Sequence, residues 1–207
     1  MKPTYQGFEA KESKQFLDVP PVGLYEAKIL NIRLVKADDE DNYLKRDYIE
    51  LFIDITEGEY KGRYMELWND QREKWGDKTP YKGIYRLVPY VKGDEEWRRS
   101  VFEGALWCVE QSNGFKPDGE PNYHWDWEEK NLVGKKVGIN VRKRLYTYKD
   151  KDRETTEIGK LESINDIKNG KAKLMNPNDR RKNKGESADS TDGSDFTDVS
   201  KTVDVPW

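Results

Sequence analysis

The densest group of residues that could bind a ligand lies between residues 142 and 153, where six cations are interleaved with two tyrosines. Single-stranded nucleic acid is bound by cations that follow its phosphates and by flat rings that stack on its bases. The period of two along a strand puts alternate residues of this group on one face. The predicted contacts on that face and in the turn after it are Arg142, Arg144, Tyr146, Tyr148 and Lys149. The alternative is a solvated hairpin whose charges only confer solubility.

A second group of cations and aromatic residues follows the turn at residues 57–62. We expect residues 63–68 to form a strand with two rings on one face. One face of such a strand must lie in the core, so these rings are either stacking platforms or core residues. The candidate ligand contacts here are Lys61, Arg63, Tyr64 and Trp68.

Residues 48–55 are the clearest strand, because isoleucines and a leucine alternate with other residues over its whole length. Tyr48 and Phe52 lie on the opposite face and are candidate stacking platforms, although they could instead pack beneath the segment 69–94. Glu50 and Asp54 share that face and would repel phosphate.

The loop before this strand contains two further candidate cations, Lys45 and Arg46, after an acidic run at residues 38–41. Acids in one contiguous run are more often solvated than bound to a metal, since a site for a hard cation needs carboxylates from separate elements. A metal-dependent nuclease therefore stays an alternative that substitution of Asp38 or Asp41 would test.

The remaining residues capable of chemistry are few. With one cysteine, Cys108, and one histidine, His124, a single chain can form neither an internal disulfide nor an ordinary zinc site. Trp125 and Trp127 directly precede a predicted strand, and we expect them to close one end of the fold rather than to stack on a ligand. We expect no cofactor, no bound metal and no enzymatic activity.

These residues need elements to position them. The apolar pattern predicts strands over residues 22–34, with a bulge where its phase slips, and over 48–55, 63–68, 136–148 and 156–164. A helix is expected from Asp94, as its cap, to Asn113, and a short capped helix ends the body near Gly170. Breakers throughout 69–94 predict an irregular insertion.

Three strands, a helix and two strands is the element order of an OB-fold, a five-stranded Greek-key barrel with its helix between strands three and four. We therefore expect a mainly β protein with three regions. These are an extended N-terminal arm (residues 1–20), an OB-fold domain (21–175) and a disordered acidic tail (176–207).

The tail has a composition of its own. Residues 186–207 hold six acids and one base, with few apolar residues, so the segment cannot bury enough surface to offset its ordering entropy. Without it, the net charge of −3 becomes about +2, so a nucleic-acid site must come from local clustering of cations. The tail ends in a rigid aromatic tip suited to docking, formed by Asp204, Val205, Pro206 and Trp207.

This tail resembles the C-terminus of bacterial-type single-stranded-DNA-binding proteins, which ends in Asp-(Ile/Val)-Pro-Phe; Trp207 replaces the final Phe. The body resembles single-stranded-DNA-binding proteins of bacteriophages of Gram-positive hosts. The similar stretches, in order, are residues 23–29, 53–63, 102–105, 132–138 and 163–170.

The resemblance implies a protein that coats single-stranded DNA during phage replication or recombination, in the host cytoplasm. Its tail would recruit replication or recombination proteins, and the protein could form homo-oligomers. The chain contains no apolar run long enough for a membrane span, so we expect no membrane partner. The alternative is an OB-fold protein-interaction module that engages a host or phage factor without binding DNA.

Overall fold

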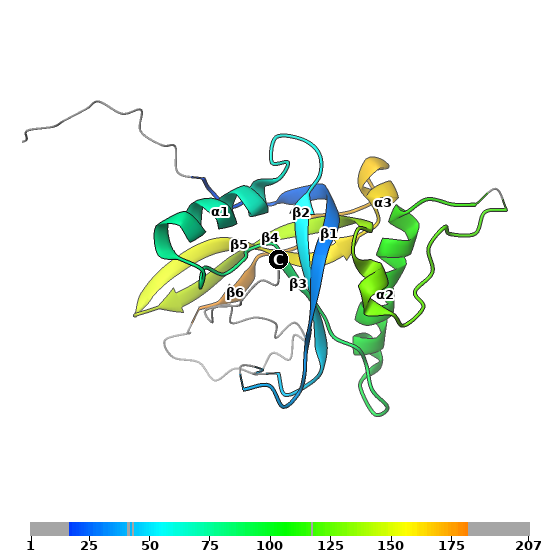
Figure 1. The fold of residues 1–207 in the computed structure, drawn as a ribbon, viewed down its shortest axis with the longest axis horizontal. Coiled ribbons are helices and arrows are strands. Elements are labelled where there is room, and N and C mark those ends of the chain that lie inside the picture. The colour runs from blue at the N-terminus through cyan, green and yellow to red at the C-terminus, as the bar shows by residue number, and fades with distance from the viewer. Residues whose placement is uncertain (1–16, 41, 43, 117, 182–207) are drawn as a thin grey trace, which may run out of the picture.

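The computed structural model describes residues 17–40, 42, 44–116 and 118–181. In this part of the chain, six strands form one mixed sheet accompanied by three α-helices, so the protein is mainly β, as predicted (Figure 1). The elements are β1 (Gly23–Val35), β2 (Tyr48–Ile55), α1 (Arg63–Trp75), β3 (Ile84–Leu87), α2 (Glu96–Ser112), the 3-10 helix η1 (Glu129–Leu132), β4 (Lys136–Tyr148), β5 (Lys151–Glu162), α3 (Ile164–Lys168) and β6 (Asn178–Arg180).

The strand order is β3-β2-β1-β4-β5, and β6 adds to β4 in parallel. The sheet is not closed, because β3 and β5 are not hydrogen-bonded to one another. The predicted closed barrel is therefore not observed. We call the unpaired boundary between β3 and β5 the seam.

β1 has the bulge that the sequence predicts, seen as a register shift between Ile29 and Asn31. The strand pairs with β4 through Gly23–Lys28 and with β2 through Ala27–Val35. The extra residue of a bulge bends a strand and increases its twist. β1 thereby joins the two halves of the sheet.

The predicted third strand, residues 63–68, is wrong: these residues begin α1. Tyr64, Leu67 and Trp68 are buried on one side of this helix, and their spacing of three and four residues suits a helix face. Asp54 of β2 also favours the helix, because its carboxylate accepts hydrogen bonds from the backbone N–H groups of Tyr64 and Met65, both at 3.1 Å. An acid predicted to repel phosphate instead caps a helix N-terminus.

The third strand of the sheet is β3, which lies inside the segment predicted to be irregular. Gly83, just before it, is needed for close approach to β2. Its carbonyl accepts from the Ile53 N–H at 2.8 Å, and an added Cβ would lie 2.2 Å from the Ile53 oxygen. The glycines and prolines of this region suggested loops, whereas pairing with β2 stabilises a short strand.

α2 occurs where the sequence predicts a helix, between β3 and β4, and lies at one end of the sheet (Figure 1). The predicted cap is wrong, because Asp94 accepts from the Val91 N–H and pairs with Arg46 instead of capping the helix. α3 is capped as expected, by the Ser163 hydroxyl, which accepts from the Asp166 N–H.

β4 and β5 form a long hairpin that projects at the end of the sheet opposite α2 (Figure 1). Its turn has two central residues, Lys149 and Asp150, both with positive φ (49° and 55°). β5 begins at Lys151, earlier than the predicted residue 156. β6 extends the sheet beyond residue 175, the predicted end of the domain. Most of the predicted N-terminal arm, and the tail from residue 182 with its tip, lie outside the described residues.

Candidate nucleic-acid interface

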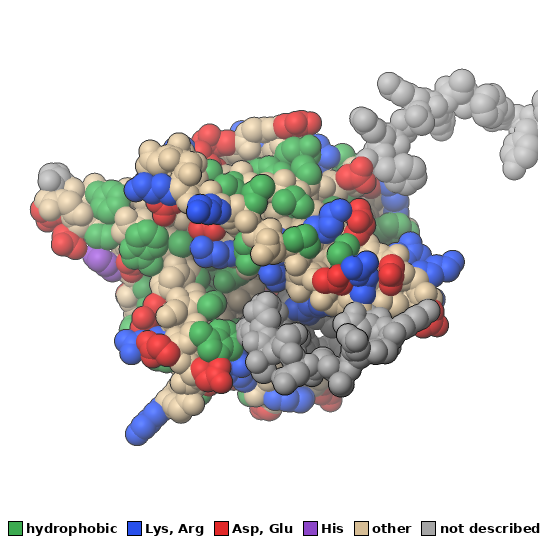
Figure 2. Space-filling model, turned by 180° about the vertical axis from the view of Figure 1, so that it is seen from behind, with side chains coloured by type: hydrophobic (Ala, Val, Ile, Leu, Met, Phe, Trp, Pro, Cys, Tyr) green, Lys and Arg blue, Asp and Glu red, His purple; other side chains and the backbone are tan. Residues whose placement is uncertain are grey.

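A cavity of about 1220 Å³ lies along the seam, between β3 and α2 on one side and the β4–β5 hairpin on the other. The segment after α3 contributes Met175 and Arg180. On the face seen in Figure 2, Lys and Arg side chains and hydrophobic side chains surround a hollow in the middle of the molecule. The volume exceeds the roughly 300–1,000 Å³ typical of a small-molecule pocket, so a longer ligand fits better.

The described lining is rich in cations. Its basic side chains are Lys82, Arg86, Arg98, Arg142, Arg144, Lys160 and Arg180. The acids of this lining are Glu157, Glu162 and Asp166. Seven basic side chains against three acidic ones give this lining a net positive charge, although the whole chain is net negative. A concentration of one charge in a concave site attracts an oppositely charged ligand.

Aromatic rings lie among these cations. They are Tyr81, Tyr85, Trp97, Phe102, Trp107, Tyr146 and Tyr148. Trp107 and Tyr148 are about half exposed (49% and 52%), whereas Tyr81 and Phe102 are buried and form part of the floor. Exposed rings beside cations are the combination that binds an unpaired strand.

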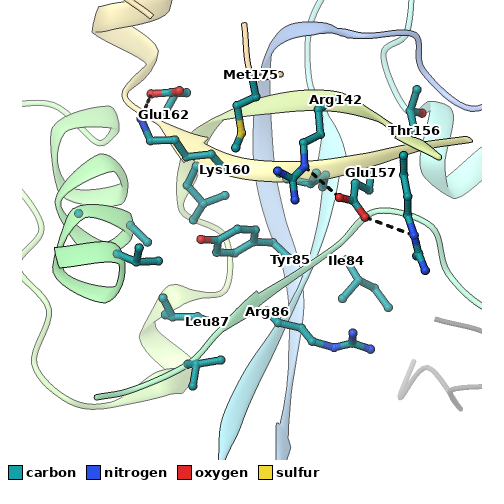
Figure 3. Close-up of a pocket in the computed structure, with 18 of the residues that line it drawn as sticks. Ile84, Tyr85, Arg86, Leu87, Arg142, Thr156, Glu157, Lys160, Glu162 and Met175 are labelled. Atoms are coloured by element: carbon teal, nitrogen blue, oxygen red, sulfur yellow. Dashed lines mark hydrogen bonds and ion pairs between the residues drawn. The ribbon is translucent and has the colours of Figure 1, made fainter. Parts of the chain in front are cut away.

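Glu157 of β5 organises the arginines of the hairpin (Figure 3). Its Oε1 accepts from Arg142 Nε at 2.9 Å and from Asn178 Nδ2 at 2.8 Å, and its Oε2 lies 3.8 Å from Arg144 Nε. One carboxylate therefore serves two guanidinium groups, both largely buried. The group holds a surplus positive charge in fixed positions.

A similar arrangement stands on the β3 side. Glu50, fully buried in β2, pairs with Arg86 at 3.0 Å and with Arg33 at 2.7 Å. Arg86 also packs over the Tyr48 ring, with its guanidinium carbon 5.6 Å from the centroid. Glu50, predicted to repel phosphate, is thus enclosed and compensated, and it holds Arg86 in the cavity wall.

Two further side chains of the β3 wall are electrostatically unusual. Lys82 is exposed, yet desolvation by surrounding atoms and repulsion from Arg144 lower its pKa. Burial raises the pKa of Tyr85 to about 12. Within the described part of the chain, neither Lys82 nor Tyr85 has a hydrogen-bond partner for its side-chain polar atom. Figure 3 shows Tyr85 and Arg86 on β3, and Arg142 and Glu157 on the strands on the other side of the cavity.

Four of the predicted contacts come together in this cavity: Arg142, Arg144, Tyr146 and Tyr148. Lys149 occupies the hairpin turn, with its Nζ 5.4 Å from the Tyr148 ring centroid. Arg142 is only 8% exposed, so its part is to form the cavity wall rather than to reach outward. Whether these residues contact DNA stays a prediction.

The predicted aromatic platforms of β2 and residues 63–68 are buried in the core, so none of them presents a face to a ligand. Phe52 and Tyr64 pack around Tyr81, with ring centroids 5.8 and 6.4 Å away, and Trp68 lies 6.4 Å from it. Tyr48 is 4% exposed. For the β2 rings, the alternative of packing beneath the segment 69–94 is the one observed, because Tyr81 packs against Phe52 and Arg86 packs over Tyr48.

The other predicted cations lie away from the cavity. Lys45 and Lys61 are exposed. Arg46 is tied to Asp94, and Arg63 lies 3.5 Å from Glu66 and packs over Tyr60. Their role in binding stays a prediction, and the structure does not bring them to the seam.

Sequence reasoning missed the β3 contribution to the cavity. The available signal was the alternation of rings and cations in Tyr81-Lys82-Gly83-Ile84-Tyr85-Arg86, the same pattern that draws attention to residues 142–148. The prolines and glycines around it obscured that pattern. α2 also supplies partly exposed side chains, Trp97, Val101 and Trp107, that its helical periodicity alone did not separate from core positions.

The tryptophan pair near β4 is divided between core and surface. Trp125 packs against the core, while Trp127 is 68% exposed and stacks on Phe102 at a centroid distance of 6.5 Å. His124 is exposed between Glu110 and Glu120, 3.7 Å from each. Cys108 is buried, and burial raises the pKa of its thiol to about 12.

The described residues contain neither a metal-binding cluster nor a membrane-spanning helix. No group of three or more His, Cys, Asp and Glu side chains there is placed to hold a metal ion. No helix there combines the length and apolar character needed to cross a membrane. Neither a scan against protein-family models nor a search of curated proteins found a match to this chain.

Proposed function

We propose that the protein binds single-stranded DNA along the seam cavity, without strong sequence preference. The observation that carries this proposal is the clustering of seven cations and seven aromatic rings in the described lining of one cavity, although the chain is net negative. Cations neutralise phosphates, and exposed rings stack on bases at roughly 1–3 kcal/mol per base whatever their identity. This is binding chemistry and requires no cofactor.

The strand order supports an OB-type architecture for this function. In an OB barrel, β1 pairs with β2 and β4, β3 follows β2, and β5 lies between β4 and β3, with a helix before β4. The order β3-β2-β1-β4-β5, with α2 after β3, has these neighbours. The difference is at the seam, where the two edges are not paired and the cavity opens.

The biological setting that we propose rests on the sequence resemblance: a phage protein that coats DNA during replication or recombination in its host. The tail would compete with DNA for the cationic cavity when DNA is absent. Once displaced, its tip at residues 204–207 would recruit partner proteins. β6 supports this proposal, because its Arg180, which belongs to the segment 176–207, lines the cavity.

The test is a titration of single-stranded and duplex oligonucleotides, followed by tryptophan fluorescence over a series of salt concentrations. We expect salt-dependent preference for the single strand, with a slope that falls by about 0.7 for each phosphate contact removed. Deletion of residues 186–207 should strengthen binding. If neither the full chain nor the deletion variant binds single strands at low salt, the proposal is wrong.

A second candidate, docking of a protein segment, is favoured by one observation. The α2 wall exposes Val101 (53%) and Trp107 (49%), which suit an apolar side chain as well as a base. This function predicts that charge reversal in the hairpin has little effect, while Val101→Asp and Trp107→Ala abolish binding of the partner. Failure of the oligonucleotide titration would make it the leading function.

A further inference from the structure

We propose that Lys82 and Arg144, which line one cavity from the β3 side and from β4, form a phosphate-binding subsite. The inference rests on the proposed function for its biological ligand, a backbone phosphate of the bound strand. The chemistry itself requires only a phosphate group, so a free polyphosphate would also be recognised. Both residues line the same cavity, one just before β3 and the other in the second half of β4.

Lys82 is a cation without a carboxylate partner in the described part of the chain. In the described part of the chain its ammonium makes no ion pair, and Arg144 repels it. Its backbone is nevertheless held firmly from both sides. Tyr81, the preceding residue, is buried and donates a hydrogen bond from its hydroxyl to the Ile53 carbonyl oxygen at 3.0 Å. The carbonyl oxygen of Gly83, the following residue, accepts a hydrogen bond from the Ile53 N–H. A long side chain on a fixed backbone can reach an anion in the seam at little cost in backbone entropy.

Arg144 supplies a donor that lacks an acceptor. Its Nε is buried and has no hydrogen-bond partner among the residues that the structure describes, and the side chain is 12% exposed. The carboxylate oxygen that forms an ion pair with it, Glu157 Oε2, is 3.8 Å from Nε, beyond hydrogen-bond distance. The Tyr146 ring packs against the guanidinium, and β5 and β6 flank the backbone of Arg144 on both sides. An oriented guanidinium with a free N–H is suited to a phosphate oxygen.

The acids in the described lining of the cavity neutralise this pair only in part. Glu162 pairs with Lys160 and accepts from Asn140, and Asp166 belongs to α3. Glu157, which forms the 3.8 Å ion pair with Arg144, also accepts from Arg142 and Asn178, so its single negative charge is shared by two guanidinium groups. A phosphate between Lys82 and Arg144 would relieve their repulsion and satisfy the buried N–H at the same time. A chloride ion satisfies the charge but has neither the size nor the several acceptor oxygens to contact both walls.

The test uses the full chain and two variants, Lys82→Ala and the matched control Lys78→Ala. Lys78 is exposed on the same connection between α1 and β3 but lies outside the cavity lining. Thermal unfolding is measured with added sodium triphosphate and with sodium chloride of equal ionic strength. We expect triphosphate to raise the melting temperature of the parent and of the Lys78 control, and to raise that of Lys82→Ala much less. Arg144→Gln, checked for native spectra first, should behave as Lys82→Ala does.

The second measurement is affinity for oligo(dT) in the same proteins. We expect Lys82→Ala to weaken binding about tenfold and to lower the salt slope by about 0.7, with no change in the Lys78 control. If the parent binds triphosphate through Lys82 but binds no oligonucleotide, the subsite takes free phosphate and the proposed function is wrong. If oligonucleotide binds equally well to the parent and to Lys82→Ala, and triphosphate protects neither, the subsite is wrong while the proposed function survives.

Discussion

At the scale of single residues, the cavity depends on how its charges are shared. Arg142 and Arg144 share Glu157, and Arg33 and Arg86 share Glu50. Each carboxylate fixes two guanidinium groups while leaving one positive charge in excess. Such groups are held in place before any ligand arrives, so less side-chain entropy is lost on binding.

Replacing Glu157 tests this arrangement. Glu157→Gln should lower the free energy of unfolding by about 3 kcal/mol, because two largely buried guanidinium groups lose their counter-charge. The matched control is Glu154→Gln on the same strand, whose pair with Lys143 at 3.2 Å is exposed, so the loss should stay under about 1 kcal/mol. Denaturant unfolding measures both. Equal losses in the two variants would contradict the shared role of Glu157.

Cys108 gives a prediction about pH. Because burial raises its thiol pKa from the ordinary value to about 12, the folded protein keeps a proton that the unfolded chain loses above about pH 8.5. This contribution to stability is fully present below the unfolded pKa and is lost as pH rises toward the folded pKa. Between pH 8.5 and 10, the stability of the parent should therefore fall more steeply than that of Cys108→Ala. Parallel stability–pH curves for the parent and for Cys108→Ala would contradict this prediction. Rapid reaction of the native thiol with a disulfide reagent at neutral pH would contradict it as well.

At the scale of elements, two features set the geometry: the tight hairpin of β4 and β5, and the capping of α1 by a neighbouring strand. The hairpin brings Tyr146 and Tyr148 to the cavity. The cap begins a helix where the alternation of residues suggested a strand. Each feature yields a prediction about stability.

Substitutions in the hairpin turn should be able to raise the stability of the protein. Lys149 and Asp150 both have positive φ, a backbone region that costs ordinary residues roughly 1–2 kcal/mol. Two-residue turns of this kind prefer Asn-Gly, so Lys149→Asn with Asp150→Gly should raise the melting temperature. Asp150→Val should lower it, since a β-branched residue fits this region poorly. If the two changes shift stability in the same direction, the turn geometry is not as described.

The helix cap should be costly to remove. Asp54→Ala deletes the acceptor of two backbone N–H groups at the start of α1, and we expect a loss of about 2 kcal/mol. Asp54→Asn keeps one acceptor oxygen and should lose less. Urea unfolding of the three proteins gives the ranking. An alanine variant as stable as the asparagine variant would show that the cap contributes little.

At the scale of the whole molecule, contacts between segments far apart in the sequence hold the elements that form the cavity walls in position. Arg46, in the loop between β1 and β2, pairs with Asp94, which precedes α2. The pair and the Val91 N–H lower the pKa of Asp94 below its ordinary value. The stabilising effect is therefore present above the unfolded pKa, about 3.9, and is lost as pH falls through the lower folded pKa.

Asp94→Asn tests this cross-link. We expect a lower melting temperature for the variant near neutral pH, and convergence of the two proteins as pH falls below about 4. Circular dichroism melts over a pH series measure the difference. The substitution Asp38→Asn, at an exposed acid of the loop between β1 and β2, provides the control and should leave the melting temperature nearly unchanged. A constant difference at all pH values would mean that Asp94 acts through packing and not through its charge.

Much of the sheet could be predicted from local patterns. The alternation in residues 48–55 and 136–148 marked β2 and β4 with their observed bounds, and the slipped phase near Ile29 marked the bulge of β1. Charge and aromatic interleaving also singled out the hairpin residues that line the cavity. These signals lie within single elements, so no knowledge of neighbours was needed.

The predictions that were wrong depended on contacts with other elements. Residues 63–68 fit a strand or a helix by their own spacing, and Asp54 and Tyr81, distant in sequence, favour the helix. Tyr48 and Phe52 fit stacking platforms by their own spacing, but Arg86 and Tyr81, from the segment 69–94, pack on them. By itself, then, the sequence determined a mainly β chain with a basic, aromatic hairpin. The tertiary structure alone decided that the sheet stays open between β3 and β5 and that Lys82 and Arg144 line the same cavity. The reason is that the position of a seam depends on pairing between strands far apart along the chain.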